Sequence, residues 1–449
     1  MADSLSIFVM NQPYTEAQVA RYDKKNHSLK KLASYRAYSI ESEDGVSILF
    51  EPGWHFQKDS DLISNPSTII DGYVKIGDMI GVNRLVATKQ ITLDPEFHGD
   101  KYEWISAYMV NAYVRYSASS KLFFFGGRTA RNYGIPNEYG LFLSDNPYPF
   151  DHFGFLAASD KFQFSWYFGR LNNMQGIDDQ GMTIPIGETQ TVQRYMAFQR
   201  LDWKINNRLQ LGLSEATLYG GPNQAPVAAY VNPFNFYYLS QRNQQVSMNG
   251  SWQVNLFYYV PQKWAIYLDF FIDDFIINND EGVDDRAIHP DRLAISSKLS
   301  IPDLWMEQTL SSLRYVRVWN ETYVTYRNFE NWVYFNKGLG YPERSYEGLK
   351  LESSYLGSEN WQVTLSLESW RRGNRSLFTT LVDEANVAFP ASPVTKGLSL
   401  LGNVQYFYNQ LDLELDIIYE YFRNEGKPIS SFIGLNLGIN YRFDVLIDI

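Results

Sequence analysis

Residues 411–422, LDLELDIIYEYF, alternate between apolar and polar positions. The odd positions from Leu411 to Tyr421 carry leucine, isoleucine or tyrosine, and only Ile418 and Phe422 break the polar series. The carboxylates of the even positions are Asp412, Glu414, Asp416 and Glu420. A period of two is typical of a β-strand whose faces meet different surroundings. A single strand of this kind is ordinary, so the fold depends on whether the chain repeats the pattern.

The alternation recurs along the chain in runs of residues that often begin or end in an aromatic side chain. The clearest runs are KFQFSWYFG (161–169), SWQVNLFYYV (251–260), KWAIYLDFFID (263–273), WQVTLSLES (361–369) and IGLNLGINYRF (433–443). Runs of about 8 to 12 residues exceed the usual soluble strand and suit a tilted strand that crosses hydrocarbon. Aromatic residues at strand ends are expected where strands meet lipid headgroups.

Short turns and long polar connections separate these runs. Asn409-Gln410 and Pro261-Gln262 read as tight turns, whereas 276–292 and 371–397 are long. This asymmetry and the strand length predict an all-β transmembrane barrel of roughly 16 to 20 antiparallel strands, apolar face toward lipid. Barrel closure is required because an open sheet edge would leave backbone groups unpaired in hydrocarbon. A soluble β-sandwich or β-helix is the alternative, but it does not explain the long strands.

Composition narrows the class of protein further. The net charge of −11 argues against a nucleic-acid partner, and the absence of cysteine excludes disulfides and thiolate metal sites. No stretch is long and apolar enough for a membrane-spanning helix. The first residues lack the basic and apolar regions of a signal peptide, so the chain is either cytoplasmic or a mature chain. The barrel pattern favours a mature chain located in the outer membrane.

The first 45 residues differ from the rest. Thr15 and Gln18 have the spacing of a capping box, and Leu29, Leu32 and Tyr35 follow at helical spacing. We therefore expect residues 1–45 to form short helices at the periplasmic end, and residues 46–449 to form the barrel.

Catalytic patterns do not emerge from the sequence. The histidines are scattered, and neither an HExxH nor a GxSxG motif occurs. A Ser-His dyad assembled across strands stays open as an alternative. We expect no enzyme activity, cofactor or structural metal, although the acidic stretch 272–285 offers oxygen ligands that would suit calcium if it were not simply solvated.

Two further stretches carry candidate binding residues. The aromatic run 230–245 supplies rings that either stack on sugars or form a membrane-interface girdle. The sugar-stacking candidates are Tyr230, Phe234, Phe236 and Tyr237. Residues 123–151 do not alternate, and their Gly, Pro and Asn content predicts a folded irregular loop or a break in a strand. Within it, Arg128, Arg131, Glu138, Asp145 and Asp151 are expected to form a polar network in the lumen.

At this stretch the chain resembles the Wzi family of outer-membrane capsule-assembly proteins. The matching residues are Gly127, Arg128, Tyr133, Gly134, Pro136, Leu141, Leu143, Ser144, Asp145, Asn146, Pro149 and Asp151. A second block comprises 211–220, Asn232-Pro233, Asn243, Asn249, Asp273, Asp274 and the terminal GINYRF. Ile135 departs from the family pattern, as does the extension beyond Phe443.

The resemblance implies a non-enzymatic outer-membrane barrel with a periplasmic helical bundle that helps to attach surface or capsular polysaccharide, binding glycan at the cell surface. For ligand binding or the lumen network we select Arg128, Asn146, Asp151, Glu215, Asn232, Asp273 and Asp274. The sugar and the oligomeric state stay open.

The alternative function is a porin-like diffusion channel for small polar solutes, since a barrel of this size holds water if nothing fills it. Bulky side chains on the inner parity instead indicate a substantially filled lumen. These are Phe257, Tyr259, Tyr267, Phe271, Trp370 and Phe407.

Overall fold

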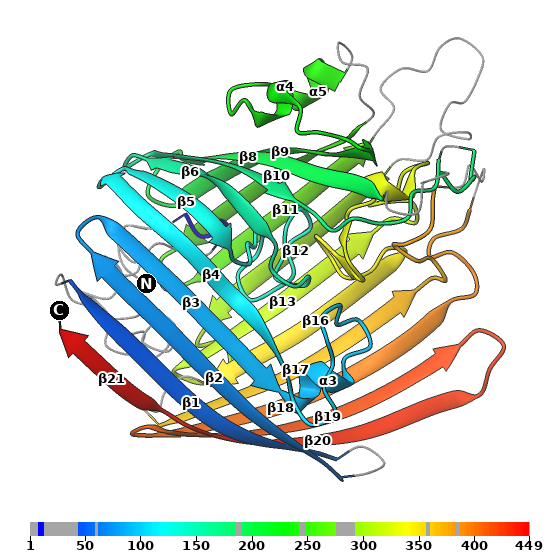
Figure 1. Cartoon of the computed structure of the whole chain (residues 1–449). Helices are drawn as coiled ribbons and strands as arrows, with labels where there is room; N and C mark the ends of the chain where they lie inside the picture. Colours follow the sequence, from blue (N-terminus) through cyan, green and yellow to red (C-terminus); the bar gives the residue numbers. More distant parts are fainter. Residues whose placement is uncertain are drawn as a thin grey trace.

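The protein folds as one continuous antiparallel sheet that curls into a barrel (Figure 1). The computed structural model describes residues 8–12, 44–58, 62–178, 180–184, 191–241, 248–274, 292–355, 360–381 and 387–448. The strands of the wall are β1 (Gly45–Lys58), β2 (Leu62–Ile76), β3 (Met79–Thr88), β4 (Ser106–Ser119), β5 (Leu122–Arg128), β6 (Asp151–Ala158), β7 (Phe162–Arg170), β8 (Val192–Lys204), β9 (Leu209–Pro222), β10 (Met248–Val260), β11 (Trp264–Asp274), β12 (Arg292–Pro302), β13 (Thr309–Val318), β16 (Tyr346–Tyr355), β17 (Trp361–Arg372), β18 (Thr395–Tyr408), β19 (Leu411–Asn424), β20 (Ile429–Tyr441) and β21 (Phe443–Asp448). The other elements are the helices α3 (Lys89–Leu93), α4 (Ala228–Val231), α5 (Tyr237–Gln241) and η1 (Asn328–Glu330), and the short strands β14 (Val333–Tyr334) and β15 (Lys337–Gly338).

The first strand closes the barrel. β1 pairs with β2 along one edge, and along the other edge it pairs with both β20 and β21. Only Arg442 separates β20 from β21, so these two segments form the two halves of one wall strand. Counted this way, the described part of the chain forms a closed 18-strand barrel. The prediction of a transmembrane barrel of 16 to 20 strands is confirmed.

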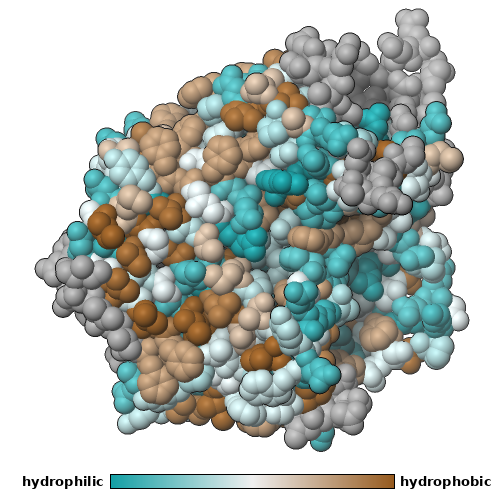
Figure 2. Space-filling view, viewed as in Figure 1, coloured by the Kyte–Doolittle hydropathy of each residue, from teal (hydrophilic) through white to brown (hydrophobic). Residues whose placement is uncertain are grey.

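The alternation of apolar and polar residues in 411–422 separates lipid-facing from lumen-facing side chains. Ile417 and Tyr419 of β19 are exposed on the outer surface, whereas Asn403 of the neighbouring strand donates hydrogen bonds to Glu414 and Asp416 on the inner side, at 3.0 and 2.6 Å. Large apolar side chains are similarly exposed on the outside of the other wall strands except β12. Figure 2 shows part of this apolar surface over the strands nearest the chain start, with hydrophilic side chains gathered toward the loops.

The two ends of the barrel differ in the length of their connections. At one end, hairpins such as Asn409-Gln410 and Pro261–Lys263 join the strands in a few residues. Asn409 adopts a left-handed φ of 53°, a conformation that asparagine tolerates in tight turns. The opposite end carries the long connections 129–150, 171–191, 223–247, 319–345 and 373–394. We call these the short-turn end and the long-loop end.

Two of the long connections fold back into the barrel. Residues 129–150 and 319–345, together called the lumen plug, bury Tyr133, Phe142 and Trp332 against inward side chains of the wall such as Phe271. From the short-turn end, residues 8–12 also reach the lumen, where Gln12 and Asn132 exchange backbone hydrogen bonds of 3.0 and 3.1 Å. The expectation of a substantially filled lumen agrees with the near-complete burial of Phe257, Tyr259 and Phe271.

Within residues 1–45, where we predict short helices, the structure describes only 8–12 and 44–45. The predicted helices lie outside the described residues, and the division into an N-terminal segment and a barrel stays a prediction. Among the described helices, none is long and apolar enough to cross a membrane.

Adjacent residues of β20 provide a test of which face meets lipid. Leu437 is exposed on the outer surface, whereas Asn436 has the inner parity and pairs in register with Asp416. Leu437→Arg should lower the free energy of unfolding by about 2–4 kcal/mol because it places a cation in hydrocarbon. Asn436→Arg should change it little, since the new cation meets a carboxylate. Urea unfolding in lipid vesicles measures both, and equal losses would contradict the assigned faces.

Candidate functional site

The two segments of the lumen plug are joined by hydrogen bonds between residues far apart in sequence. Ser144 Oγ donates to the carbonyl of Gly340 at 2.6 Å, and Asn146 Nδ2 donates to the carbonyl of Gly338 at 2.8 Å. The indole of the fully buried Trp332 donates to the carbonyl of Phe142 at 2.6 Å. Because an irregular buried backbone must satisfy its polar groups, these bonds fix both segments as one unit.

A buried carboxylate attaches the plug to the barrel wall. Glu138 lies 3.0 Å from both Lys298 of β12 and Arg314 of β13, and Lys350 of β16 approaches to 4.0 Å. Burial alone would raise the pKa of the Glu138 carboxyl, but the opposing effect of Arg314, Lys298 and Lys350 prevails and holds the pKa below its usual value. Glu138 is therefore a charged anchor inside the barrel.

Strand β11, the neighbour of β12 in the sheet, also holds the plug. Asp269 accepts hydrogen bonds from the side-chain amide of Gln253 at 2.7 Å and from the backbone N–H of Leu141 at 3.2 Å. Asp273 accepts the backbone N–H of Tyr323 at 2.9 Å. Both plug segments are thus bound to the same wall strand.

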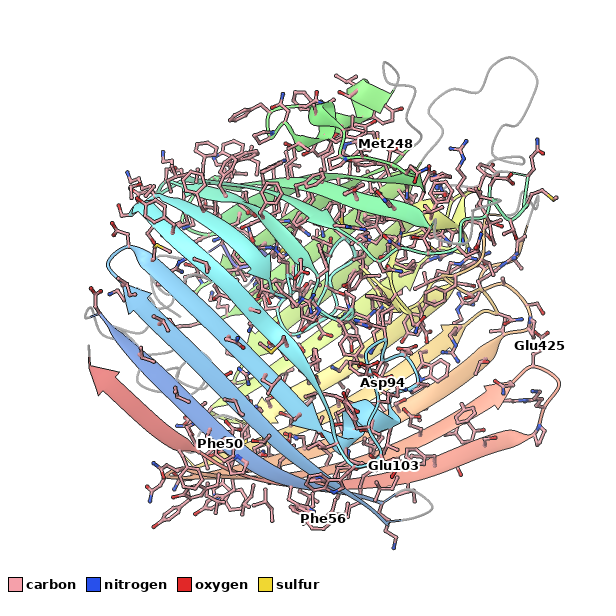
Figure 3. All side chains as sticks on the ribbon, in the orientation of Figure 1. Phe50, Phe56, Asp94, Glu103, Met248 and Glu425 are labelled. Carbon is pink, nitrogen blue, oxygen red and sulfur yellow. The ribbon has the colours of Figure 1, made fainter. Side chains whose placement is uncertain are left out.

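A third connection, residues 89–105 between β3 and β4, contacts the plug at the long-loop end. Tyr148 donates to Asp94, which follows α3, at 2.5 Å, and Lys337 lies 3.4 Å from the same carboxylate. The ring of His98 stacks on Phe335 with centroids 3.6 Å apart. Figure 3 places Asp94 beside α3 at the rim.

Next to the plug, the lumen holds a cavity of about 500 Å³, which we call the mouth cavity. Its wall residues have the inner parity of β16 to β19, and Arg372, Thr395 and Asn424 place it at the long-loop end. The residues that line it are Tyr139, Tyr341, Pro342, Glu343, Tyr346, Glu368, Trp370, Arg372, Thr395, Ser399, Glu420, Phe422 and Asn424. The cavity combines aromatic rings with three carboxylates and one guanidinium.

Small residues and hydrogen bonds shape the mouth cavity. Gly397 stands opposite Trp370 in the strand register, and a Cβ there would come within 2.3 Å of the indole, so only glycine leaves room for this ring. The Trp370 indole donates to Ser399 at 3.2 Å, and the Tyr346 hydroxyl donates to Glu368 at 3.0 Å. Glu343 pairs with Arg372 at the entrance. Hydrogen bonds and an ion pair within the protein therefore fix the positions of Trp370, Glu368 and Glu343.

The residues selected from the sequence separate into three places. Asn146 and Asp273 belong to the plug contacts described above. Arg128 and Asp151 are paired in register on β5 and β6 and form a bidentate ion pair. Two guanidinium nitrogens of Arg128 each lie 2.9 Å from a carboxylate oxygen of Asp151. Asp274 ends β11, and its side chain lies outside what the structure describes, as does most of the acidic stretch 272–285.

The remaining selected residues lie on the outside of the barrel. Glu215 shares the outward parity of Leu213 on β9 and is therefore not part of the lumen network. Ligand binding, the other role for which we selected Glu215, stays a prediction. Asn232 accepts the backbone N–H of Phe234 at 3.1 Å. Tyr230 and Tyr237 are completely buried, which leaves Phe234 and Phe236 as the accessible rings of the sugar-stacking candidates.

None of the residues that line the mouth cavity is among the residues selected from the sequence. Trp370 was identified only as a bulky inward residue, and Glu420 and Phe422 only as members of the alternating stretch 411–422. Tyr139, Tyr341 and Glu343 come from the plug, and no local pattern places them beside β17 and β19.

One buried histidine is held by hydrogen bonds beside the plug. The His152 ring accepts a hydrogen bond from Arg131 at 2.7 Å and lies 3.0 Å from the carbonyl of Phe150. In the described ranges, no group of three or more His, Asp or Glu side chains is arranged to hold a metal ion.

The closed sheet and the filled lumen define a transmembrane β-barrel of the kind found in outer-membrane proteins. Neither a protein-family model nor a curated protein matches the sequence. Among solved structures, the chain is similar to Wzi of Escherichia coli, described as an outer-membrane protein involved in group 1 capsule assembly and as a carbohydrate-binding β-barrel. The identity is 14%, the TM-score is 0.64, and the match covers 98% of this chain and 96% of that one.

The fold is also similar to two Pseudomonas aeruginosa proteins. These are OccD3 (13% identity, TM-score 0.51, covering 90% of this chain and 92% of that chain) and OpdK, solved with vanillate (12% identity, TM-score 0.51, covering 89% and 99%). At these identities the similarities establish the fold.

Glu138 gives the plug a testable pH dependence. Glu138→Gln should lower the free energy of unfolding at pH 7 by about 3 kcal/mol because it leaves buried cations without their partner. The pKa of Glu138 in the folded state lies below its ordinary value of 4.5. The carboxylate therefore stabilises the fold fully above about pH 4.5, and this stabilisation is lost as the pH falls through the folded-state pKa.

The difference between wild type and Glu138→Gln should therefore shrink in acid, as measured by urea unfolding across pH 3 to 7. Glu96→Gln is the matched control, because the Glu96 side chain is 52% exposed and lies 3.5 Å from Lys337. A pH-independent difference for Glu138→Gln would contradict its role as a charged anchor.

Proposed function

We propose that the protein is a non-enzymatic outer-membrane barrel that binds surface or capsular polysaccharide at the cell surface. In barrels of this class the short turns face the periplasm and the long loops face outward. The long-loop end, with the mouth cavity, would then meet the polysaccharide outside the cell.

The composition of the mouth cavity is the observation that carries this proposal. Sugar rings present apolar C–H faces that pack on aromatic side chains, and their hydroxyl groups donate hydrogen bonds to carboxylates. Tyr139, Trp370 and Phe422 supply the rings, and Glu368 and Glu420 supply the acceptors. Because carboxylates outnumber guanidinium groups here, neutral or amino sugars fit better than acidic ones.

The likeness to carbohydrate-binding Wzi supports the same proposal at the level of fold. The resemblance in the sequence blocks 127–151 and 211–220 points in the same direction. This proposal assigns the selected residues Asn146 and Asp273 to holding the plug beside the cavity, and it assigns them no direct contact with glycan.

A diffusion channel is the second candidate. In its favour, the fold resembles OpdK, which was solved with vanillate, and the inner wall of β19 carries the carboxylates Glu414 and Asp416. Against it, residues 129–150 and 319–345 occupy the lumen together with 8–12. A channel would require a path past these segments.

Trp370→Ala should weaken binding of a capsular oligosaccharide by about tenfold, because it removes the largest ring of the cavity, worth about 1.5 kcal/mol of stacking. Trp361→Ala is the matched control, since Trp361 lies on the same strand but is exposed on the outer face. Isothermal titration calorimetry with the detergent-folded protein measures both variants. Equal affinities for wild type and Trp370→Ala would remove the mouth cavity from the proposed function.

A further inference from the structure

Residues 223–241, called the outer loop, pack against the outside of the barrel. Figure 1 shows α4 and α5 outside the wall, over β8, β9 and β10, and Figure 3 places Met248 beneath them. Trp166, Tyr195 and Tyr219 have the outward parity of their strands, yet all three are buried because the outer loop covers them. The Trp166 indole donates to the Tyr237 hydroxyl at 2.9 Å, and the Tyr219 hydroxyl accepts the backbone N–H of Val227 at 3.0 Å.

A carboxylate lies beneath this loop on the lipid-facing side of the wall. Glu215 is 8% exposed and accepts hydrogen bonds from Gln199 Nε2 at 2.7 Å and from the backbone N–H of Tyr238 at 3.0 Å. Gln199 also donates to the carbonyl of Asn235 at 2.9 Å. On the same strands, Leu201 and Leu213 are exposed on the outer surface. The outer loop thus supplies the polar partners that hydrocarbon cannot give.

The surface of the outer loop that faces away from the barrel is apolar. Phe234, Phe236 and Leu239 are 80%, 67% and 61% exposed. The Phe234 ring stacks on Phe164, an outward residue of β7, with centroids 6.2 Å apart and planes 10° apart, so the loop surface continues the apolar surface of the wall. Residues 216–241 contain no Asp, Glu, Lys, Arg or His. A loop extending into water would leave a large apolar patch without a partner.

We infer that the outer loop is a membrane-contacting element whose exposed side chains Phe234, Phe236 and Leu239 contact lipid acyl chains of the leaflet at the long-loop end. The wall beneath the loop faces lipid, and the apolar surface of the loop is continuous with it. We therefore choose lipid as the partner of the loop. The loop then has two roles: it extends the apolar surface of the barrel, and it shields Glu215 from hydrocarbon. This inference is independent of glycan binding in the mouth cavity.

The absence of cysteine allows a direct test with single-cysteine variants carrying an environment-sensitive fluorophore. Labels at Phe236→Cys and Leu239→Cys should be quenched by lipids with brominated acyl chains as strongly as a label at Leu365→Cys, which is on the outer face of β17 and 61% exposed. Aqueous iodide should quench them far less than a label at Lys427→Cys in the exposed turn after β19. Heat-modifiable migration on gels checks that each barrel is folded.

Iodide quenching at positions 236 and 239 equal to that at 427 would overturn the inference. If added capsular oligosaccharide relieved such quenching, the loop would belong to a glycan site instead.

Glu215 also anchors the outer loop, because it accepts the backbone N–H of Tyr238, and this role has its own test in the same system. Glu215→Ala should detach the loop, so that the label at 236 gains the iodide quenching seen at 427, while Glu215→Gln keeps a partner for Gln199 and should preserve lipid contact. The control Glu420→Ala alters a carboxylate of the inner parity and should leave the label unchanged. A label that stays lipid-quenched in folded Glu215→Ala would overturn the assignment of Glu215 as the anchor.

Discussion

The closed wall of this protein follows from the fact that hydrocarbon offers no hydrogen-bond partner to the backbone. The sheet must therefore close, and the pairing of β1 with both β2 and the β20–β21 strand achieves this. Closure gives each strand an outer face in lipid and an inner face in the lumen, which is the origin of the alternation in 411–422. The same constraint acts on Glu215, whose carboxylate is tolerated on the outer face because backbone and side-chain donors surround it.

The lumen differs from the lipid-facing surface, because it accommodates polar and charged side chains that form hydrogen bonds or ion pairs. Glu138 with its three cations and Asp269 with its amide and backbone donors attach irregular segments to a regular wall. Such buried pairs contribute little net stability compared with apolar packing, but breaking one of them is costly. They define how the plug sits in the barrel, and the plug in turn forms one side of the mouth cavity through Tyr139 and Tyr341.

Sequence reasoning predicted the barrel because a period of two is a local property that each strand shows by itself. The same period places Glu215 outside, since it shares the parity of Leu213, although we selected Glu215 for ligand binding or the lumen network. The mouth cavity was beyond prediction, because Tyr341 and Trp370 come together only after two connections have folded inward. The burial of Tyr230 and Tyr237 likewise depends on packing of the outer loop against β7 to β9, which no local pattern encodes.

We propose that the plug closes the lumen, so that the long-loop end acts by binding and not by passage. Planar-bilayer recording of the purified, detergent-folded full-length protein tests it most directly. The account predicts insertion without steady conductance steps across a range of applied voltages. Stable, reproducible steps would contradict it, because they would require an open aqueous path through the segments that bury Tyr133, Phe142 and Trp332.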